Sequence, residues 1–243
     1  GFPINFLYGP PGTGKDELNH AVKSLWGIPQ EATNLEGKHA TKTATIRELA
    51  QFSNTLLEWS EYARGDSELD GTIKSVWDLR GKKIGQKESR VQTDNLPVLC
   101  GITLTGNESP DSPAAITRLV WNDMNRTIFN KEAEKHFNEL NDIIEEGVTH
   151  ITLKILNKRE LVQKNFNREY RLLMDVYQRR MPDCNKRMLK NISTLTAFYN
   201  ILKDEIDFPF NLNQILDHFT TISIAQMRKL TNSSITTRWW DCF

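Results

Sequence analysis

Short apolar runs alternate with longer polar stretches over the first half of the chain. The four clearest runs are Ile4–Tyr8, Thr55–Trp59, Val98–Leu104 and Leu119–Trp121. Each run is closely followed by Gly, Ser or Asn, which is typical of buried β-strands, and the segments between the runs are long enough for crossover helices. The pattern therefore predicts an α/β fold with a parallel sheet and helices on its faces.

Beyond Lys131 the apolar positions follow a helical spacing instead, which predicts amphipathic helices packed into a core. Three stripes carry this signal: Phe137, Leu140, Ile143 and Ile144; Leu161, Tyr170, Leu173, Val176 and Tyr177; and Leu195, Phe198, Tyr199 and Leu202. Pro182 and Pro209 punctuate the helical stretches, because proline interrupts a helix interior. We expect an α/β core over residues 1–128 and an all-helical C-terminal subdomain over residues 129–243.

The composition is that of an ordinary soluble globular protein. The 243 residues include 31 Lys and Arg against 31 Asp and Glu, and 38% are hydrophobic. This charge balance excludes a domain that coats nucleic acid over its whole surface, but it allows a local basic channel. No window approaches the roughly 18 apolar residues of a membrane span, so we expect no membrane partner. No signal peptide is visible, and we expect a cytoplasmic protein.

The cysteines and histidines disfavour a metal or thiol enzyme. Cys100, Cys184 and Cys242 lie far apart and match no zinc or redox spacing, and the five histidines are scattered. We therefore expect reduced thiols. The first apolar run begins almost at Gly1, and large apolar residues fill Trp239–Phe243, so we also expect a fragment of a longer polypeptide.

The most specific motif directly follows the first apolar run. It reads Gly9, Pro10, Pro11, Gly12, Thr13, Gly14, Lys15 and Asp16, and it matches the Walker A pattern G-x-x-x-x-G-K up to its last position. Glycines let backbone N–H groups converge on phosphate oxygens, and the helix expected next points its positive end at the same anion. Lys15 adds a point charge for the β- and γ-phosphates. We expect ATP to bind here; the alternative is a tight turn without a ligand.

The last position of the motif holds Asp16, where a Ser or Thr hydroxyl usually binds Mg²⁺. The second apolar run is followed directly by Ser60 and Glu61, at the positions where a Walker B strand carries an Asp for the metal and a Glu for the attacking water. We predict that Asp16 and Ser60 form one Mg²⁺ site with exchanged ligand types, and that Glu61 is catalytic. The alternative is a degenerate site that binds nucleotide and hydrolyses it poorly. Glu58 precedes Trp59 and lies one residue too early.

Two further polar residues stand at strand boundaries. Asn107 follows the third run, where P-loop ATPases place a residue that orients the hydrolytic water; a strand-end turn at Gly106-Asn107 is the alternative. Arg118 directly precedes the fourth run, a placement suited to an arginine finger for the γ-phosphate of a neighbouring subunit. A solvated or ion-paired surface arginine fits this position about as well.

A basic segment with glycines occupies residues 80–90, between the second and third runs. It carries Lys82, Lys83, Lys87 and Arg90. As a hairpin or loop projecting into the pore of a ring, it would follow nucleic-acid phosphates; a solvated loop is the alternative. The segment contains no aromatic residue, so base stacking is not predicted.

The order of these motifs resembles that of an AAA+ ATPase. More narrowly, it resembles the superfamily-3-like helicase domain of primase–helicase proteins from phages, plasmids and integrated elements of bacteria. Four further stretches strengthen the narrower resemblance: Leu49–Asn54, Asp94–Val98, Pro113–Val120 and Gly147–Leu153.

The resemblance implies a homo-oligomer, a hexameric ring that converts ATP hydrolysis into movement along single-stranded DNA during replication. It also implies that the C-terminal helices form a lid over the nucleotide. Arg187 would then be a sensor of phosphate, although a basic surface cluster explains it equally well. The departures at Asp16 and Ser60 leave a second interpretation open, in which the chain is a nucleotide-gated assembly scaffold that does not hydrolyse ATP.

Overall fold

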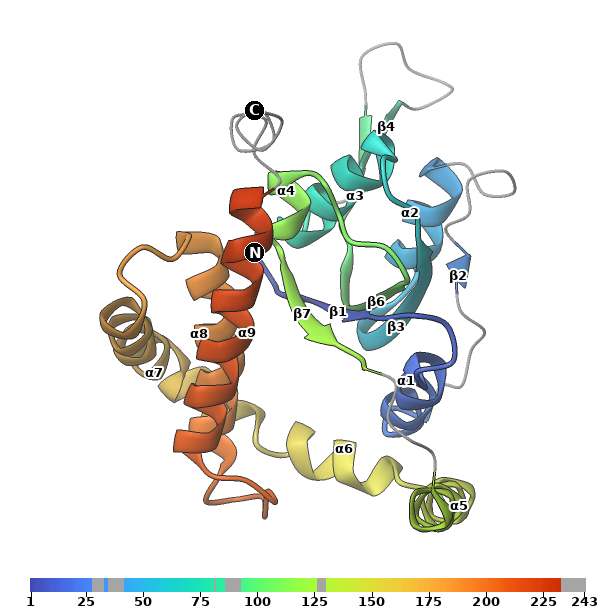
Figure 1. Cartoon of the computed structure of the whole chain (residues 1–243), viewed down its shortest axis with the longest axis vertical. Helices are drawn as coiled ribbons and strands as arrows, with labels where there is room; N and C mark the ends of the chain where they lie inside the picture. Colours follow the sequence, from blue (N-terminus) through green and yellow to red (C-terminus); the bar gives the residue numbers. More distant parts are fainter. Residues whose placement is uncertain (28–32, 35–41, 81, 86–92, 126–129, 233–243) are drawn as a thin grey trace.

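The computed structural model describes residues 1–27, 33–34, 42–80, 82–85, 93–125 and 130–232. Its centre is a five-stranded sheet in the order β2-β3-β6-β1-β7, in which every pairing is parallel. The strands are β1 (Ile4–Tyr8), β2 (Thr33–Asn34), β3 (Ser53–Tyr62), β6 (Leu99–Gly106) and β7 (Leu119–Asp123). The predicted α/β sheet is therefore confirmed, and the strand that ends before Asn107 lies between β1 and β3 (Figure 1).

Three helices and the sheet enclose the main hydrophobic core. They are α2 (Lys42–Ala50), α3 (Ser67–Trp77) and the short α4 (Pro113–Ile116). Phe6, Leu104 and Trp121 are neighbours in the strand register, and all three pack into this core. The Phe6 and Trp121 rings meet edge to face at 5.2 Å, a favoured arrangement of aromatic pairs. Residues of neighbouring strands therefore pack together on the face of the sheet that borders this core.

A separate antiparallel ribbon joins β4 (Lys82–Gly85) and β5 (Thr93–Leu96). It stands out from the α/β core at the top of Figure 1. The basic segment predicted as a hairpin or loop therefore contributes the first strand of this ribbon, and the second strand begins beyond the segment, at Thr93.

From Lys131 onward the described chain is helical. The helices are α5 (Lys131–Glu146), α6 (Thr149–Leu156), α7 (Arg159–Arg180), α8 (Lys186–Leu202) and α9 (Leu212–Asn232). Pro182 and Pro209 fall in the breaks on either side of α8, as predicted. A second hydrophobic core forms among α7, α8 and α9, and α9 returns to the sheet, where Gln226 donates hydrogen bonds to backbone oxygens of Ile116 and Leu119.

The described helices and cysteines bear on the expectations about membrane insertion and thiol chemistry. None of the described helices is long and apolar enough to cross a membrane. Cys100 and Cys184 are buried free thiols, and burial raises the pKa of each to about 11. Thiols of this kind are chemically inert. Cys242 lies outside the described residues.

Candidate functional site

The Gly9–Asp16 loop connects β1 to α1 (Lys15–Ser24) at the carboxyl edge of the sheet. A Cβ atom at Gly9 would lie 2.2 Å from the backbone oxygen of Met124, so only glycine fits there. Gly12 and Gly14 have φ angles of 75° and 79°, a left-handed conformation that glycine adopts without strain. The loop therefore needs these glycines for its backbone geometry.

Lys15 is folded into this loop. Its Nζ donates hydrogen bonds to the backbone oxygens of Gly9 at 2.7 Å and Pro10 at 2.9 Å, and to Oδ1 of Asn107 at 2.9 Å. The side chain is buried, and burial lowers the pKa of the ammonium, while the charge of Asp16 raises it. The structure thus brings the loop lysine and the predicted water-orienting residue into direct contact.

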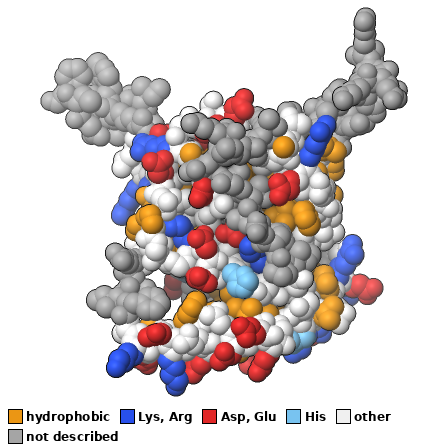
Figure 2. Space-filling view, turned by 90° about the vertical axis from the view of Figure 1, so that its right-hand side faces the viewer, with side chains coloured by type: hydrophobic (Ala, Val, Ile, Leu, Met, Phe, Trp, Pro, Cys, Tyr) orange, Lys and Arg blue, Asp and Glu red, His pale blue; other side chains and the backbone are white. Residues whose placement is uncertain are grey.

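The first turn of α1 is open toward solvent at its amino end. Gly14 is the N-cap residue and provides no side-chain hydrogen bond to the free N–H groups. Uncapped N–H groups at a helix start, together with the helix dipole, attract anions. On the face turned to the viewer in Figure 2, acidic side chains gather across the middle. The first turn of α1 itself carries the carboxylates of Asp16 and Glu17, so the groups that could attract an anion here are the N–H groups of the loop and the ammonium of Lys15.

The carboxyl end of β3 contains a β-bulge. Trp59 pairs with Leu104, but Tyr62 pairs with Gly106, so β3 holds one extra residue in this interval. Glu61 lies in it with φ 63°, which is uncommon for a residue with a side chain. Bulges and left-handed residues re-aim side chains near functional sites, at a cost of about 1–3 kcal/mol for the backbone strain.

A cavity of about 970 Å³ opens beside the loop and collects most of the predicted site residues. Its lining includes Pro11, Gly12, Thr13, Gly14, Lys15, Asp16, Ser60, Glu61 and Asn107. Phe137 and Leu140 of α5 add an apolar wall. Among the described residues, no group of three His, Cys, Asp or Glu side chains comes together.

The cavity also contains charged residues that the sequence analysis set aside or missed. Glu58 and Lys23 line it, and they form an ion pair of 2.6 Å with both side chains almost fully buried. Asn19 donates a second hydrogen bond to the Glu58 carboxylate at 3.0 Å. Two features of the sequence could have indicated this ion pair. Glu58 is a charged residue inside an apolar strand run, and Asn19 and Lys23 follow Lys15 at four-residue spacing in α1.

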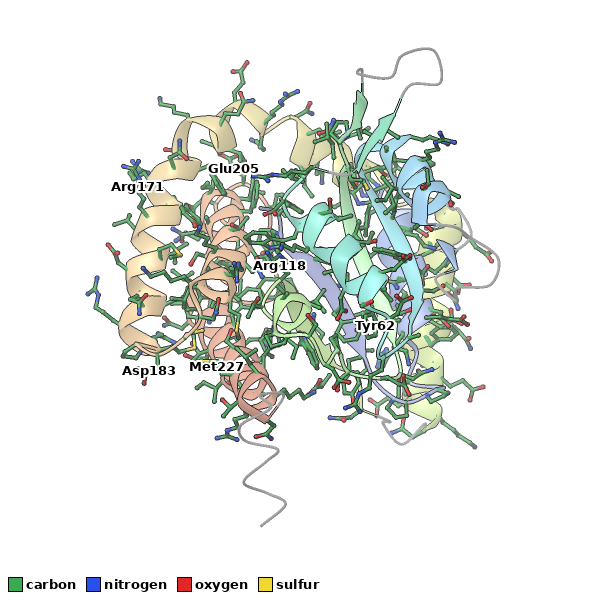
Figure 3. The ribbon with its side chains drawn as sticks, turned by 90° about the horizontal axis from the view of Figure 1, so that it is seen from above. Tyr62, Arg118, Arg171, Asp183, Glu205 and Met227 are labelled. Carbon is green, nitrogen blue, oxygen red and sulfur yellow. The ribbon has the colours of Figure 1, made fainter. Side chains whose placement is uncertain are left out.

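Arg118 does not join this cavity. Its side chain is only 3% exposed, donates to the backbone oxygen of Ala114 at 2.7 Å and lies over the Trp77 ring. Figure 3 places it between the α/β core and the helical part. In this conformation the guanidinium is not presented to a neighbouring subunit, which corrects the exposed placement expected from the sequence. Burial, and then the charge of Arg187, lower the pKa of Arg118, while the charge of Asp78 raises it.

The basic segment is only partly described. Lys82 and Lys83 belong to β4, whereas Lys87 and Arg90 lie outside the described residues.

Comparison with known proteins yields a structural likeness only. No protein-family model and no curated protein sequence matches the chain. A solved structure of the SCCmec type IV helicase Cch, described as an active helicase, matches 94% of this chain with a TM-score of 0.68 at 14% sequence identity. The chain has a helicase-like fold. It spans 43% of the Cch chain, and at this identity the likeness concerns the fold alone.

Proposed function

We propose that this chain is an ATP-binding and ATP-hydrolysing motor domain of the AAA+ type that acts on DNA. The observation that carries the proposal is the convergence of the Gly9–Asp16 loop, Lys15 and Asn107 on one cavity at the carboxyl edge of a parallel sheet. Open α/β sheets bind ligands at that edge, and a glycine-rich loop before a helix is suited to phosphate.

The contacts of Lys15 support phosphate binding. Its ammonium is held by two backbone oxygens, one amide oxygen and the hydroxyl oxygen of Thr13, all uncharged acceptors. Phosphate oxygens carry charge and make stronger hydrogen bonds to an ammonium, so a nucleoside triphosphate would draw Lys15 away from these acceptors. Asn107 would then be released to orient the attacking water next to the γ-phosphate.

Asp16, Ser60 and Glu61 would complete the hydrolytic site. Asp16 and Ser60 offer a carboxylate and a hydroxyl to the same cavity, and both are oxygen ligands suited to Mg²⁺. The cation would neutralise the phosphate charge that develops during transfer. Glu61, re-aimed by the bulge of β3, would act on the water.

The DNA-acting part of the proposal rests on the fold and on the ribbon. Cch is an active helicase by its description, and the described fold of this chain matches it. The β4–β5 ribbon carries Lys82 and Lys83 and stands out from the core, a suitable position for following a single strand inside a ring of copies. We extend the proposal to replication of phage or mobile-element DNA. Because Arg118 is buried, it has no part in the proposed mechanism.

The decisive experiment is a metal-dependent ATPase assay with and without single-stranded DNA. We expect Mg²⁺-dependent turnover that DNA stimulates and that Lys15→Ala abolishes. Equal turnover in wild type and Lys15→Ala would refute the proposal. DNA binding should also weaken steeply as salt rises, because contacts to phosphates release counterions.

A second function is favoured by one observation, the hydroxyl of Ser60 in place of a carboxylate at the end of β3. In that case the chain would be a scaffold that assembles when it binds nucleotide and turns over none. Size-exclusion chromatography separates the two functions: assembly with ATP but without metal-dependent turnover supports the scaffold.

A further inference from the structure

The helix that follows the Gly9–Asp16 loop is attached to the sheet by polar side chains. The buried residues of α1 are Lys15, Asn19 and Lys23. They are four positions apart, so they form one stripe along the helix. A helix on a sheet normally turns an apolar stripe toward it. The attachment of α1 must therefore depend on hydrogen bonds and charge more than on apolar packing.

One carboxylate receives two of these three side chains. Glu58 Oε1 accepts a hydrogen bond from Asn19 Nδ2 at 3.0 Å, and Glu58 Oε2 accepts one from Lys23 Nζ at 2.6 Å. The Lys23 and Glu58 side chains are 7% and 5% exposed, so water screens the pair little. Both donors come from α1, and the carboxylate comes from β3, two residues before Ser60.

Stability alone does not account for a buried pair of this kind. Removing two charges from water is costly, and a well-packed apolar pair of similar volume is often as stable or more stable. Apolar contacts, however, are non-directional, whereas hydrogen bonds to a carboxylate have defined lengths and angles. A buried polar contact can therefore fix the register of two elements.

We infer that Glu58, together with Asn19 and Lys23, is a set of positioning residues that fixes the register of α1 against β3. Lys15 stands at the start of α1, and Ser60 and Glu61 stand at the end of β3, so this register sets the spacing between the two halves of the cavity. The effect of this register on turnover rests on the function proposed above. The register of α1 against β3 is independent of that function.

The test replaces the pair by an apolar one, Glu58→Leu with Lys23→Leu. We expect the urea midpoint of unfolding to be equal to or above that of wild type, while backbone amides of α1 exchange with D₂O at least about tenfold faster, because the helix is no longer held in register. Turnover should fall about 100-fold, the effect of a small misplacement of reacting groups, with the ATP dissociation constant changed by less than about threefold.

A charge-reversed variant separates positioning from mere packing. Glu58→Lys with Lys23→Glu recreates an ion pair, and the Asn19 amide offers an oxygen to the new lysine. We expect slow exchange of α1 to return, and turnover to recover at least about tenfold over the double leucine variant. The matched control is Arg180→Leu with Asp217→Leu, which removes an exposed ion pair of the helical part. It should change neither the amide exchange of α1 nor the turnover.

Exchange of α1 at the wild-type rate in the double leucine variant, with wild-type turnover, would overturn the inference. If that variant does not fold, the charge-reversed variant decides: slow exchange of α1 supports the inference, and fast exchange overturns it. The exchange measurement needs no nucleotide. If wild type neither binds nor hydrolyses ATP, the proposed function fails, and the register of α1 is still judged by exchange.

Discussion

Two helices of this molecule are buried by opposite means. In α8 six of the ten buried residues are apolar, namely Met188, Leu189, Ile192, Ala197, Ile201 and Leu202, and the other four are Asn191, Ser193, Thr194 and Thr196. In α1 the buried residues are Lys15, Asn19 and Lys23. Helix α8 holds the helical part together, whereas we infer that α1 holds the candidate site in position. The comparison teaches that apolar burial supplies stability, and that directed polar contacts supply position at some cost in stability.

The largest effect on stability should come from a buried leucine of α8. Leu189 has no exposed surface, and Leu189→Ala would leave a cavity inside the second core, so we expect a loss of about 2–5 kcal/mol in the free energy of unfolding. Urea denaturation measures it. Leu153→Ala on α6 is the control, since Leu153 is 58% exposed and its truncation should cost less than about 0.5 kcal/mol. Similar losses at both positions would contradict the assigned burial.

Lys15→Ala should weaken ATP binding more than it lowers the stability of the fold. We expect ATP affinity to fall about 100-fold or more, equivalent to roughly 2.7 kcal/mol, because the cation that meets the phosphates is lost. The free energy of unfolding should fall less, because burial lowers the pKa of this ammonium and so offsets part of what its hydrogen bonds to Gly9, Pro10 and Asn107 contribute. Calorimetric titration with ATP and a thermal melt measure the two quantities. Lys190→Ala, an exposed lysine of α8, is the control for charge.

A hydrogen bond between the α/β core and the helical part should contribute less to the free energy of unfolding than Leu189 does. Trp77 Nε1 donates a buried hydrogen bond to Asn191 Oδ1 at 2.8 Å, joining α3 to α8. Asn191→Ala leaves that indole N–H without this acceptor, and we expect a loss of about 1–3 kcal/mol. In a double-mutant cycle with Trp77→Phe, the two losses should be clearly non-additive. Additive losses would mean that the bond contributes nothing.

The smallest effect should come from a helix cap on the surface. Asp66 accepts hydrogen bonds from the backbone N–H groups of Glu68 and Leu69 at 2.9 and 3.0 Å, at the start of α3. Asp66→Ala should cost about 1 kcal/mol in the free energy of unfolding, and Asp66→Asn, which keeps a capping oxygen, should cost less. Equal losses for the two variants would point to charge instead of capping.

Much of the fold could be predicted because the relevant signals are local. The apolar runs became strands, the prolines fell between helices, and the Gly9–Asp16 loop lay between β1 and α1. Parallel strands with loops at one edge also brought Ser60, Glu61 and Asn107 to the same cavity. The strand β2 was not predicted, because two residues carry too little periodicity to be recognised.

The sequence by itself determined the α/β class, the glycine loop and the set of residues available to it, since backbone freedom and hydrophobic periodicity act between near neighbours in the chain. Only the tertiary structure decided which charges became partners. It buried Arg118 against the ring of Trp77, and it paired Glu58 with Lys23 across 35 positions of the chain. Such pairings depend on how α1 and α3 pack against strands far away in the sequence, and no local pattern of residues specifies that packing.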